Sequence, residues 1–198
     1  MNRNLQSIYR RWRIRRLPLA TLIILALNII GFIFELIKGE DYMLTRYAMY
    51  QGAIQDGEWL RVPLHAFLHI GFPHILCNMF CLVTYGLTLE QRIGSVRFAL
   101  IYVAGIIGSA VLINITGGFV STGYFYMPNI HAGASGALWG LMAAMLVYCL
   151  RNHLNPTYAL RGIVLNLIYS FSFNVSWQGH IGGGIAGALA ALMLLRDL

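Results

Sequence analysis

The chain has 198 residues, of which 58% are hydrophobic and only 11% charged, and its formal net charge is +7. A water-soluble domain of this size could not expose so apolar a sequence without aggregating, so the composition excludes an ordinary soluble protein. We therefore expect an integral membrane protein.

Six apolar stretches of about 17 to 22 residues follow one another along the chain, each close to the length that a helix needs to cross a hydrocarbon core. They cover residues 17–37, 72–89, 98–116, 132–150, 157–175 and 178–195. We expect a single domain over residues 1–198, all-α and polytopic, with six transmembrane helices in a compact bundle. Because no small-residue cleavage site follows the first stretch, it is expected to be retained as a helix.

The orientation follows from the basic residues. Segment 1–16 contains six arginines, and the positive-inside rule places it in the cytoplasm, to which six crossings also return the C-terminus. Under this topology only Lys38, Arg46 and Arg61 are basic on the outer side. The positive charge then reflects topology and contact with anionic lipid, and no nucleic acid is expected as a partner.

Polar residues open the second span, after an outer first loop over residues 38–71. His74 and Asn78 are four residues apart, so they share one helix face. An ionisable residue inside a membrane span indicates function, although a structural hydrogen-bonded pair would look the same. Cys77 and Cys81 lie on the same helix as His74, but no fourth soft ligand is apparent, so we expect no metal or cofactor.

The fourth span opens with "HAGASGALWG", in which Ser135 stands among small residues. A lone serine in a membrane helix most often packs against another helix or bonds to its own backbone. The sixth span, however, opens with His180, 45 positions later, which is close to one round trip through two helices. Ser135 and His180 should therefore lie at similar depth.

Glycine stripes explain how these two spans could meet. Glycines recur every four residues in both, a pattern that lets helix backbones approach closely. The stripes are Gly136 and Gly140 in span four, and Gly179, Gly183 and Gly187 in span six. Close packing would bring His180 near Ser135, and Trp139, one turn after Ser135, could stack on the imidazole.

The motifs "HILCNM", "GASGALWG" and "GHIGGGIAG", in this order over six apolar stretches, resemble those of the rhomboid intramembrane serine proteases of bacterial type. The resemblance implies that Ser135 is the nucleophile and His180 its general base. It implies that His74 and Asn78 help to hold the oxyanion.

The resemblance extends to the loops. Arg61 matches an arginine of the first outer loop, and Glu90 a structural acid at the inner end of span two. Leu60 and Trp139 depart from the family pattern, in which Trp and Tyr or Phe are more usual, so substrate preference stays open.

The resemblance also implies partners and location. The partners would be the lipid bilayer and single-span membrane proteins, cut near the outer end of the span, with no oligomer required. We expect a multi-pass protein of a bacterial plasma membrane whose active site opens to the outer side. Span five, with Ser170, Ser172 and Asn174 at its outer end, is the expected substrate gate.

Two other functions remain possible from the sequence. A small transporter or channel could use the same polar residues, but they cluster in one layer, whereas a pore needs polar lining at all depths. An inactive relative could bind membrane proteins without cutting them, but it would be free to lose Ser135 or His180.

Overall fold

Three helical stretches of the computed structural model are long and apolar enough, by length and composition, to cross a membrane. They are α2 (Leu19–Lys38), the stretch Phe72–Ile93, and α7 (Ser95–Thr116). The structure describes residues 17–121, 126–172 and 176–196. Three further helices complete the bundle: α8 (Ser135–Arg151), α9 (Thr157–Ser172) and α10 (Trp177–Leu194). A helical membrane protein with three clear spans is thus confirmed, and the full set of six crossings stays a prediction.

The second span is not one regular α-helix. It consists of α5 (Phe72–Cys81), the π-helical turn η2 (Leu82–Gly86) and α6 (Leu87–Ile93). A Cβ on Gly86 would lie 3.0 Å from the side chain of Thr21 in α2, so the absence of a side chain lets this turn pack closely on the first span. The spacing of apolar residues contains no signal for such a turn.

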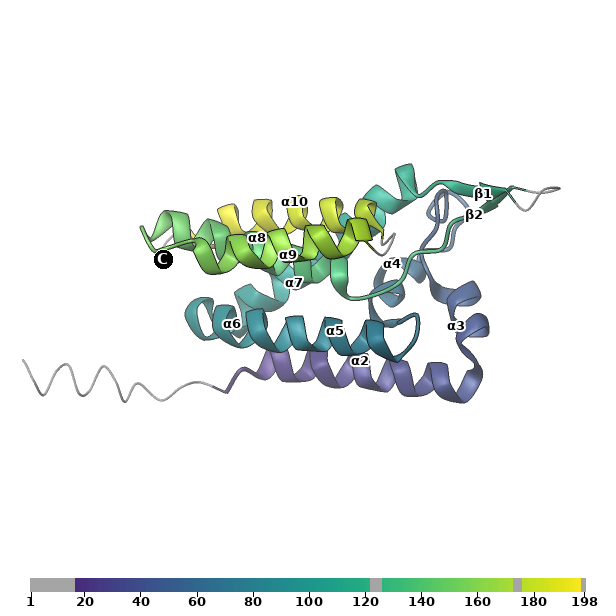
Figure 1. The fold of residues 1–198 in the computed structure, drawn as a ribbon, viewed down its shortest axis with the longest axis horizontal. Coiled ribbons are helices and arrows are strands. Elements are labelled where there is room, and N and C mark those ends of the chain that lie inside the picture. Colours follow the sequence, from purple (N-terminus) through teal and green to yellow (C-terminus); the bar gives the residue numbers. More distant parts are fainter. Residues whose placement is uncertain (1–16, 122–125, 173–175, 197–198) are drawn as a thin grey trace, which may run out of the picture.

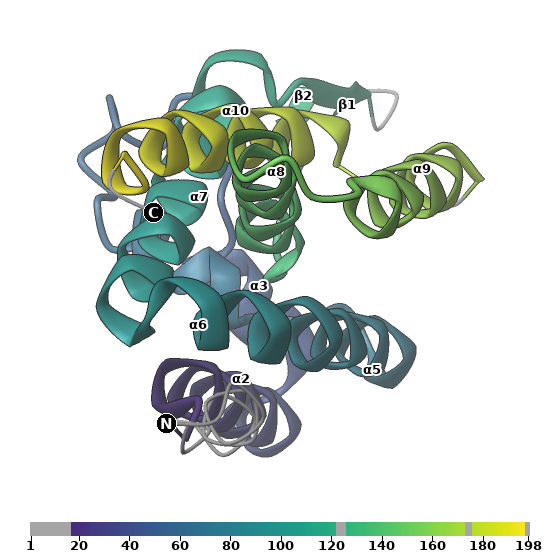
Figure 2. The same ribbon diagram turned by 90° about the vertical axis from the view of Figure 1, so that its left-hand side faces the viewer.

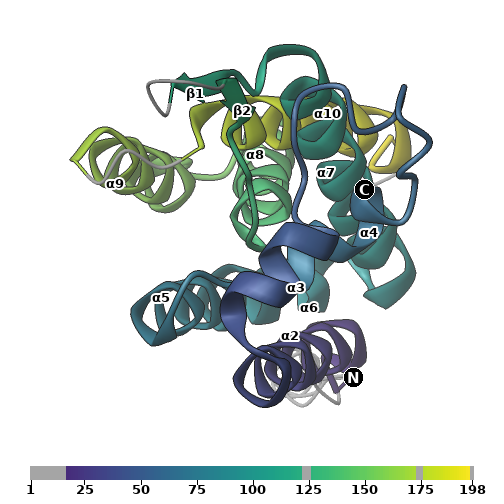
Figure 3. The ribbon, with the colours of Figure 1, turned by 90° about the vertical axis from the view of Figure 1, so that its right-hand side faces the viewer.

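Helix α8 packs against both α7 and α10 and lies in the middle of the bundle, between α10 and the second span (Figure 2). Their contacts run through glycine. A Cβ on Gly105 would lie 2.8 Å from Cα of Ala137, and a Cβ on Gly140 would lie 3.0 Å from the carbonyl oxygen of Gly183. The predicted contact between the two glycine stripes is therefore confirmed. Helix α9 lies at the edge of the bundle, beside α8 (Figures 2 and 3).

Glu90 joins the ends of two spans. Its carboxylate accepts hydrogen bonds from the backbone N–H groups of Ala20 and Thr21, at 2.9 and 2.7 Å, and from the hydroxyls of Thr21 and Ser95. The acid thus satisfies N–H groups at the start of α2, which have no partner within their own helix. The structural position expected for Glu90 is confirmed.

Helix α2 begins and α10 ends at the same end of the bundle, which fits an even number of passes (Figure 1). The basic segment 1–16 lies outside the described residues. The opposite end carries the first outer loop, with α3 (Glu40–Tyr47), α4 (Arg61–Leu64) and the 3-10 turn η1 (His65–Phe67).

The helical fold also contains one short β-hairpin. At the same end as α3, strands β1 (Phe119–Ser121) and β2 (Tyr126–Pro128) pair antiparallel, with Val120 opposite Met127. Strands of three residues are too short to leave a periodic pattern in the sequence. A further backbone bridge joins Met49 to His131, with N···O distances of 2.8 and 2.7 Å, and fixes the first outer loop to the segment that leads into α8.

Candidate active site

Ser135 and His180 are in contact. Nε2 of His180 lies 2.9 Å from Oγ of Ser135, within hydrogen-bond distance. Ser135 is the first residue of α8, and His180 lies in the first turn of α10, where it is 4% exposed. The prediction that these two residues reach the same depth is confirmed. With the ring proton on Nδ1, the hydroxyl of Ser135 donates to Nε2 of His180, which could then accept its proton.

Glycines on either side of this pair allow the contact. Gly136 follows Ser135 and Gly179 precedes His180, and a Cβ on Gly136 would lie 3.0 Å from the carbonyl oxygen of Gly179. The same Cβ would overlap the side chain of Ser109 in α7. At the residue next to Ser135, the backbone of α8 therefore lies against the backbone of α10 and a small side chain of α7.

Trp139 restrains the imidazole. Its indole stacks on the ring of His180, with centroids 5.3 Å apart and planes inclined by 16°. The expected stacking is confirmed. Because the indole covers one face of the ring, it restrains the imidazole with its edge towards Ser135.

The start of α8 offers backbone donors. Gly133, with φ +122, gives the chain a conformation outside the helical region, and Ala134 is the N-cap of α8. The first N–H groups of a helix lack intrahelical acceptors and lie at the positive end of its dipole. These groups surround Ser135 and could stabilise negative charge on an atom bound to its oxygen. The sequence placed this helix start three residues earlier, at 132, because it contains no sign of the turn at Gly133.

His74 and Asn78 border the same backbone. A Cβ on Gly133 would lie 2.8 Å from Nε2 of His74 and 3.5 Å from Nδ2 of Asn78. The backbone N–H of Ile70 donates to Nδ1 of His74 at 3.2 Å, so the neutral ring carries its proton on Nε2, the atom that faces Gly133. Nδ2 of Asn78 is buried and has no hydrogen-bond partner among the described residues. Two donors thus lie beside the segment that leads into Ser135.

Two further histidines support this region, and sequence reasoning did not single them out. The backbone N–H of Gly133 donates to the carbonyl oxygen of His65 at 2.8 Å, and the His65 ring lies 2.8 Å from the carbonyl oxygen of Val62. The ring of His69 is buried edge-to-face against His74, with centroids 5.2 Å apart, and its backbone N–H donates to the carboxylate of Glu35 at 2.9 Å. Burial lowers the pKa of His65 to about 4 and that of His69 to about 3. The available signal was the presence of three histidines within ten residues of "HAFLHIGFPH".

Arg61 lies outside this cluster and holds the first outer loop. Its Nη1 donates to the carbonyl oxygen of Ala48 at 2.7 Å, its Nε lies 3.4 Å from the carboxylate of Glu58, and its guanidinium covers the ring of Tyr50. Leu60, beside it, is 69% exposed.

No cluster of three metal-ligating side chains occurs in the described ranges. Cys77 and Cys81 are free thiols, of which Cys77 is exposed. At the expected gate, Asn174 lies outside the described residues, and so do the side chains of Ser170 and Ser172.

A family model of the rhomboid domain matches residues 56–197 of the chain. The chain is 34% identical over 187 residues to rhomboid protease GluP of Bacillus subtilis, a match that covers 89% of this chain and 35% of that protein. It is 31% identical over 191 residues to the putative rhomboid protease YdcA of the same organism, with 92% of each chain covered. It is 27% identical over 200 residues to rhomboid protease AarA of Providencia stuartii, with 87% of this chain and 71% of that protein covered. The chain thus spans only about a third of the length of GluP, but nearly all of YdcA.

Proposed function

The chain belongs to the rhomboid family, and from this premise we propose that it is an intramembrane serine endopeptidase that cuts single-span membrane proteins near the outer end of the span. The contact of 2.9 Å between Oγ of Ser135 and Nε2 of His180 carries the proposal. A serine hydroxyl is a weak nucleophile until an adjacent base takes its proton, and histidine suits that task near neutral pH.

In the proposed reaction, Oγ of Ser135 attacks the scissile carbonyl carbon while Nε2 of His180 takes the hydroxyl proton. The tetrahedral intermediate then breaks its C–N bond, and His180 gives the proton to the leaving amine. This leaves an acyl ester on Ser135. A water molecule, deprotonated by His180, attacks the ester and releases the new carboxyl end, while the proton returns to Oγ.

The negative oxygen of the intermediate would form next to Gly133 and the start of α8. Nε2–H of His74, the amide of Asn78 and the first N–H groups of α8 are the proposed donors to it. A well-aimed oxyanion donor contributes on the order of 3 kcal/mol to catalysis. Asn78 supports this assignment because its buried donor has no partner among the described residues, an arrangement that costs stability unless it serves a ligand.

The depth of Ser135 determines what can be cut. A continuous substrate helix hides its carbonyl groups in backbone hydrogen bonds, so the scissile segment must unwind. Substrates should therefore carry glycine, alanine or proline near the outer end of their span. Span five is the proposed entry side, since α9 packs on the rest of the bundle at its edge.

The same proposal includes the topology. Six crossings with both termini in the cytoplasm, in a bacterial plasma membrane, place the active site on the outer side, and neither a cofactor nor an oligomer is needed for the reaction. Ser135 and His180 lie at the starts of α8 and α10, and their contact fits an active site at one depth.

The deciding experiment uses the full chain purified into lipid vesicles, incubated with a panel of single-span substrates whose products are mapped by mass spectrometry. We expect one cut near the outer end of the span, lost in Ser135→Ala and in His180→Ala although both variants stay folded. A fluorophosphonate should label Ser135 alone, and chelators should leave cleavage unchanged. Substantial cleavage by Ser135→Ala, or cuts at the cytoplasmic end of the span, would refute the proposal.

A further inference from the structure

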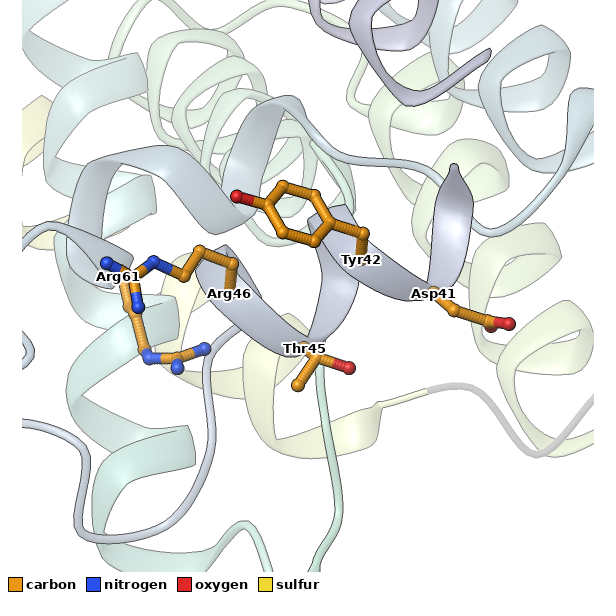
Figure 4. A pocket seen from close by; sticks show the side chains of 5 residues that line it. All are labelled: Asp41, Tyr42, Thr45, Arg46 and Arg61. Atoms are coloured by element: carbon orange, nitrogen blue, oxygen red, sulfur yellow. The ribbon is translucent and has the colours of Figure 1, made fainter. Parts of the chain in front are cut away.

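A pocket of about 500 Å³ lies on the first outer loop. It is lined by Asp41, Tyr42, Thr45 and Arg46 of α3 and by Arg61, the first residue of α4 (Figure 4). None of Ser135, His180, His74 and Asn78 lines it. The pocket is therefore separate from the candidate active site and needs its own explanation.

Two cations line this pocket from different elements. In Figure 4 the guanidinium groups of Arg46 and Arg61 both lie on the left of the view, towards which the hydroxyl of Tyr42 also points, whereas the carboxylate of Asp41 points to the right. Tyr42 and Arg46 are four residues apart on α3, so they share a helix face. The acidic residue of the pocket thus does not neutralise the two guanidinium groups.

The two arginines differ in their partners. Arg61 is held by Ala48 and by Glu58, as described above. Arg46 is exposed and makes no hydrogen bond or ion pair with any residue in the described part of the chain. Two like charges in one pocket, one of them without an acid, favour an anion that both can contact.

The pocket also lies next to the end of a membrane span. Helix α3 follows α2 after a single residue, Gly39, whose φ of +96 turns the chain. Two large aromatic side chains of this loop are exposed: Tyr42, which lines the pocket, at 57%, and Trp59, two residues before Arg61 in the sequence, at 63%. Tryptophan and tyrosine gather at the level of lipid headgroups, where their apolar rings and polar edges are both solvated.

We propose that this pocket binds the phosphate of a membrane phospholipid headgroup. Arg46 and Arg61 contact the phosphate oxygens, and the hydroxyl of Tyr42 donates a further hydrogen bond. Guanidinium forks match phosphate oxygens in geometry, and basic pockets at the membrane surface bind lipid headgroups in this way. The site is independent of the proposed protease reaction.

The lipid would also fix the loop that supports the active site. Arg61 begins the short helix α4, which is followed directly by His65, and the carbonyl of His65 accepts the N–H of Gly133. A phosphate bound to Arg61 would therefore stabilise the loop only four residues before His65, which makes this hydrogen bond.

The test measures lipid binding to the full chain in detergent micelles by native mass spectrometry. The probes are palmitoyl-oleoyl phosphatidylethanolamine and phosphatidylglycerol, with the matching diacylglycerol as the lipid without phosphate. The variants are Arg46→Gln and, as a charge-matched control, Arg151→Gln at the exposed far end of α8. All are made in the Ser135→Ala background, so the result does not depend on cleavage.

We expect both phospholipids to bind and Arg46→Gln to weaken their binding about fivefold, the effect of one arginine near a lipid surface, with Arg151→Gln unchanged. Arg46→Lys should retain part of the affinity. Equal binding by Arg46→Gln and Arg151→Gln would overturn the site, and so would equal binding of diacylglycerol. Inorganic phosphate that displaces the lipid at similar concentration would show a site for free phosphate and would overturn the assignment to lipid.

Discussion

Gly183 of α10 lies so close to the backbone carbonyl of Gly136 in α8 that a Cβ at position 183 would overlap the carbonyl oxygen. Neither backbone can give way locally, so any side chain here must separate the two helices. Ser135 and His180 lie on these helices within one turn of the contact. Their hydrogen bond therefore depends on the absence of a single methyl group.

We expect Gly183→Ala to misplace His180 and to lower the rate of cleavage on the order of a hundredfold, the cost of a shift of about 1 Å in a reacting group. Gly184→Ala is the matched control, because a Cβ there would meet only the ring of Trp139, at an ordinary 3.8 Å. The two variants are compared by their cleavage rates in lipid vesicles and by their thermal unfolding in detergent. If Gly183→Ala cleaves as fast as the wild-type chain, the close contact at Gly183 is not required for catalysis.

Asn78→Ala should lower kcat by about a hundredfold or more and change KM little, because an oxyanion donor acts in the transition state and not on the bound substrate. Cys77→Ala is the control on the same helix, since its thiol is exposed. The measurement is steady-state cleavage of one substrate in lipid. A rise in KM with unchanged kcat would instead assign Asn78 to substrate binding.

A disulfide can test the proposed entry side. The side chain of Asn166 in α9 interacts with the thiol of Cys81 in α5. In a chain with Cys77→Ala and Cys149→Ala, Asn166→Cys should form a disulfide with Cys81 on oxidation. Cleavage of membrane substrates should then fall at least tenfold and return on reduction, with the reduced variant as its own control. Undiminished cleavage by the fully oxidised protein would exclude movement of α9 away from α5 as the entry step.

Acid should destabilise the fold through His65. Burial lowers its pKa from 6.5 to about 4, so the unfolded chain binds this proton more tightly than the folded one. The contribution of neutral His65 to the free energy of unfolding is fully present above pH 6.5. It decreases as the pH falls from 6.5 to 4 and stays constant below pH 4. At pH 5 the loss is about 2 kcal/mol. Unfolding at pH 7 and pH 5 in detergent measures the loss. The variant His65→Gln should reduce this loss by about 2 kcal/mol, while the lowered pKa of His69 maintains a further dependence on pH. An equally steep dependence in that variant would contradict the assignment.

The features that could be predicted from the sequence are those that show as a repeat or as a spacing between two residues. The spacing of 45 residues placed Ser135 and His180 at one depth, and the four-residue glycine repeat placed their helices in contact. The supporting residues could not be found in this way. His65 and His69 lie outside the spans, and their partners, the N–H of Gly133 and the carboxylate of Glu35, are distant in sequence.

The first outer loop was equally hard to predict. Helix α3 has eight residues and α4 only four, so neither leaves a stripe of apolar residues long enough to recognise. The π-helical turn at Leu82–Gly86 has no sequence signature, because the apolar residues of the second span continue through it without a break. These elements are set by contacts between segments and not by local preference.

The contact between Gly136 and Ser109 has a consequence for ion permeability. Ser109 lies seven residues before Thr116, the last residue of α7, which at 1.5 Å per residue places the start of α8 about 10 Å below that end of the bundle. Below Ser135, most of the next ten residues of α8 are buried against its neighbours. Water therefore needs to reach Ser135 only from the near end of the bundle. The buried part of α8 closes the bundle to water on the other side of Ser135. The proposed hydrolysis at Ser135 could then proceed without opening a path for ions across the membrane.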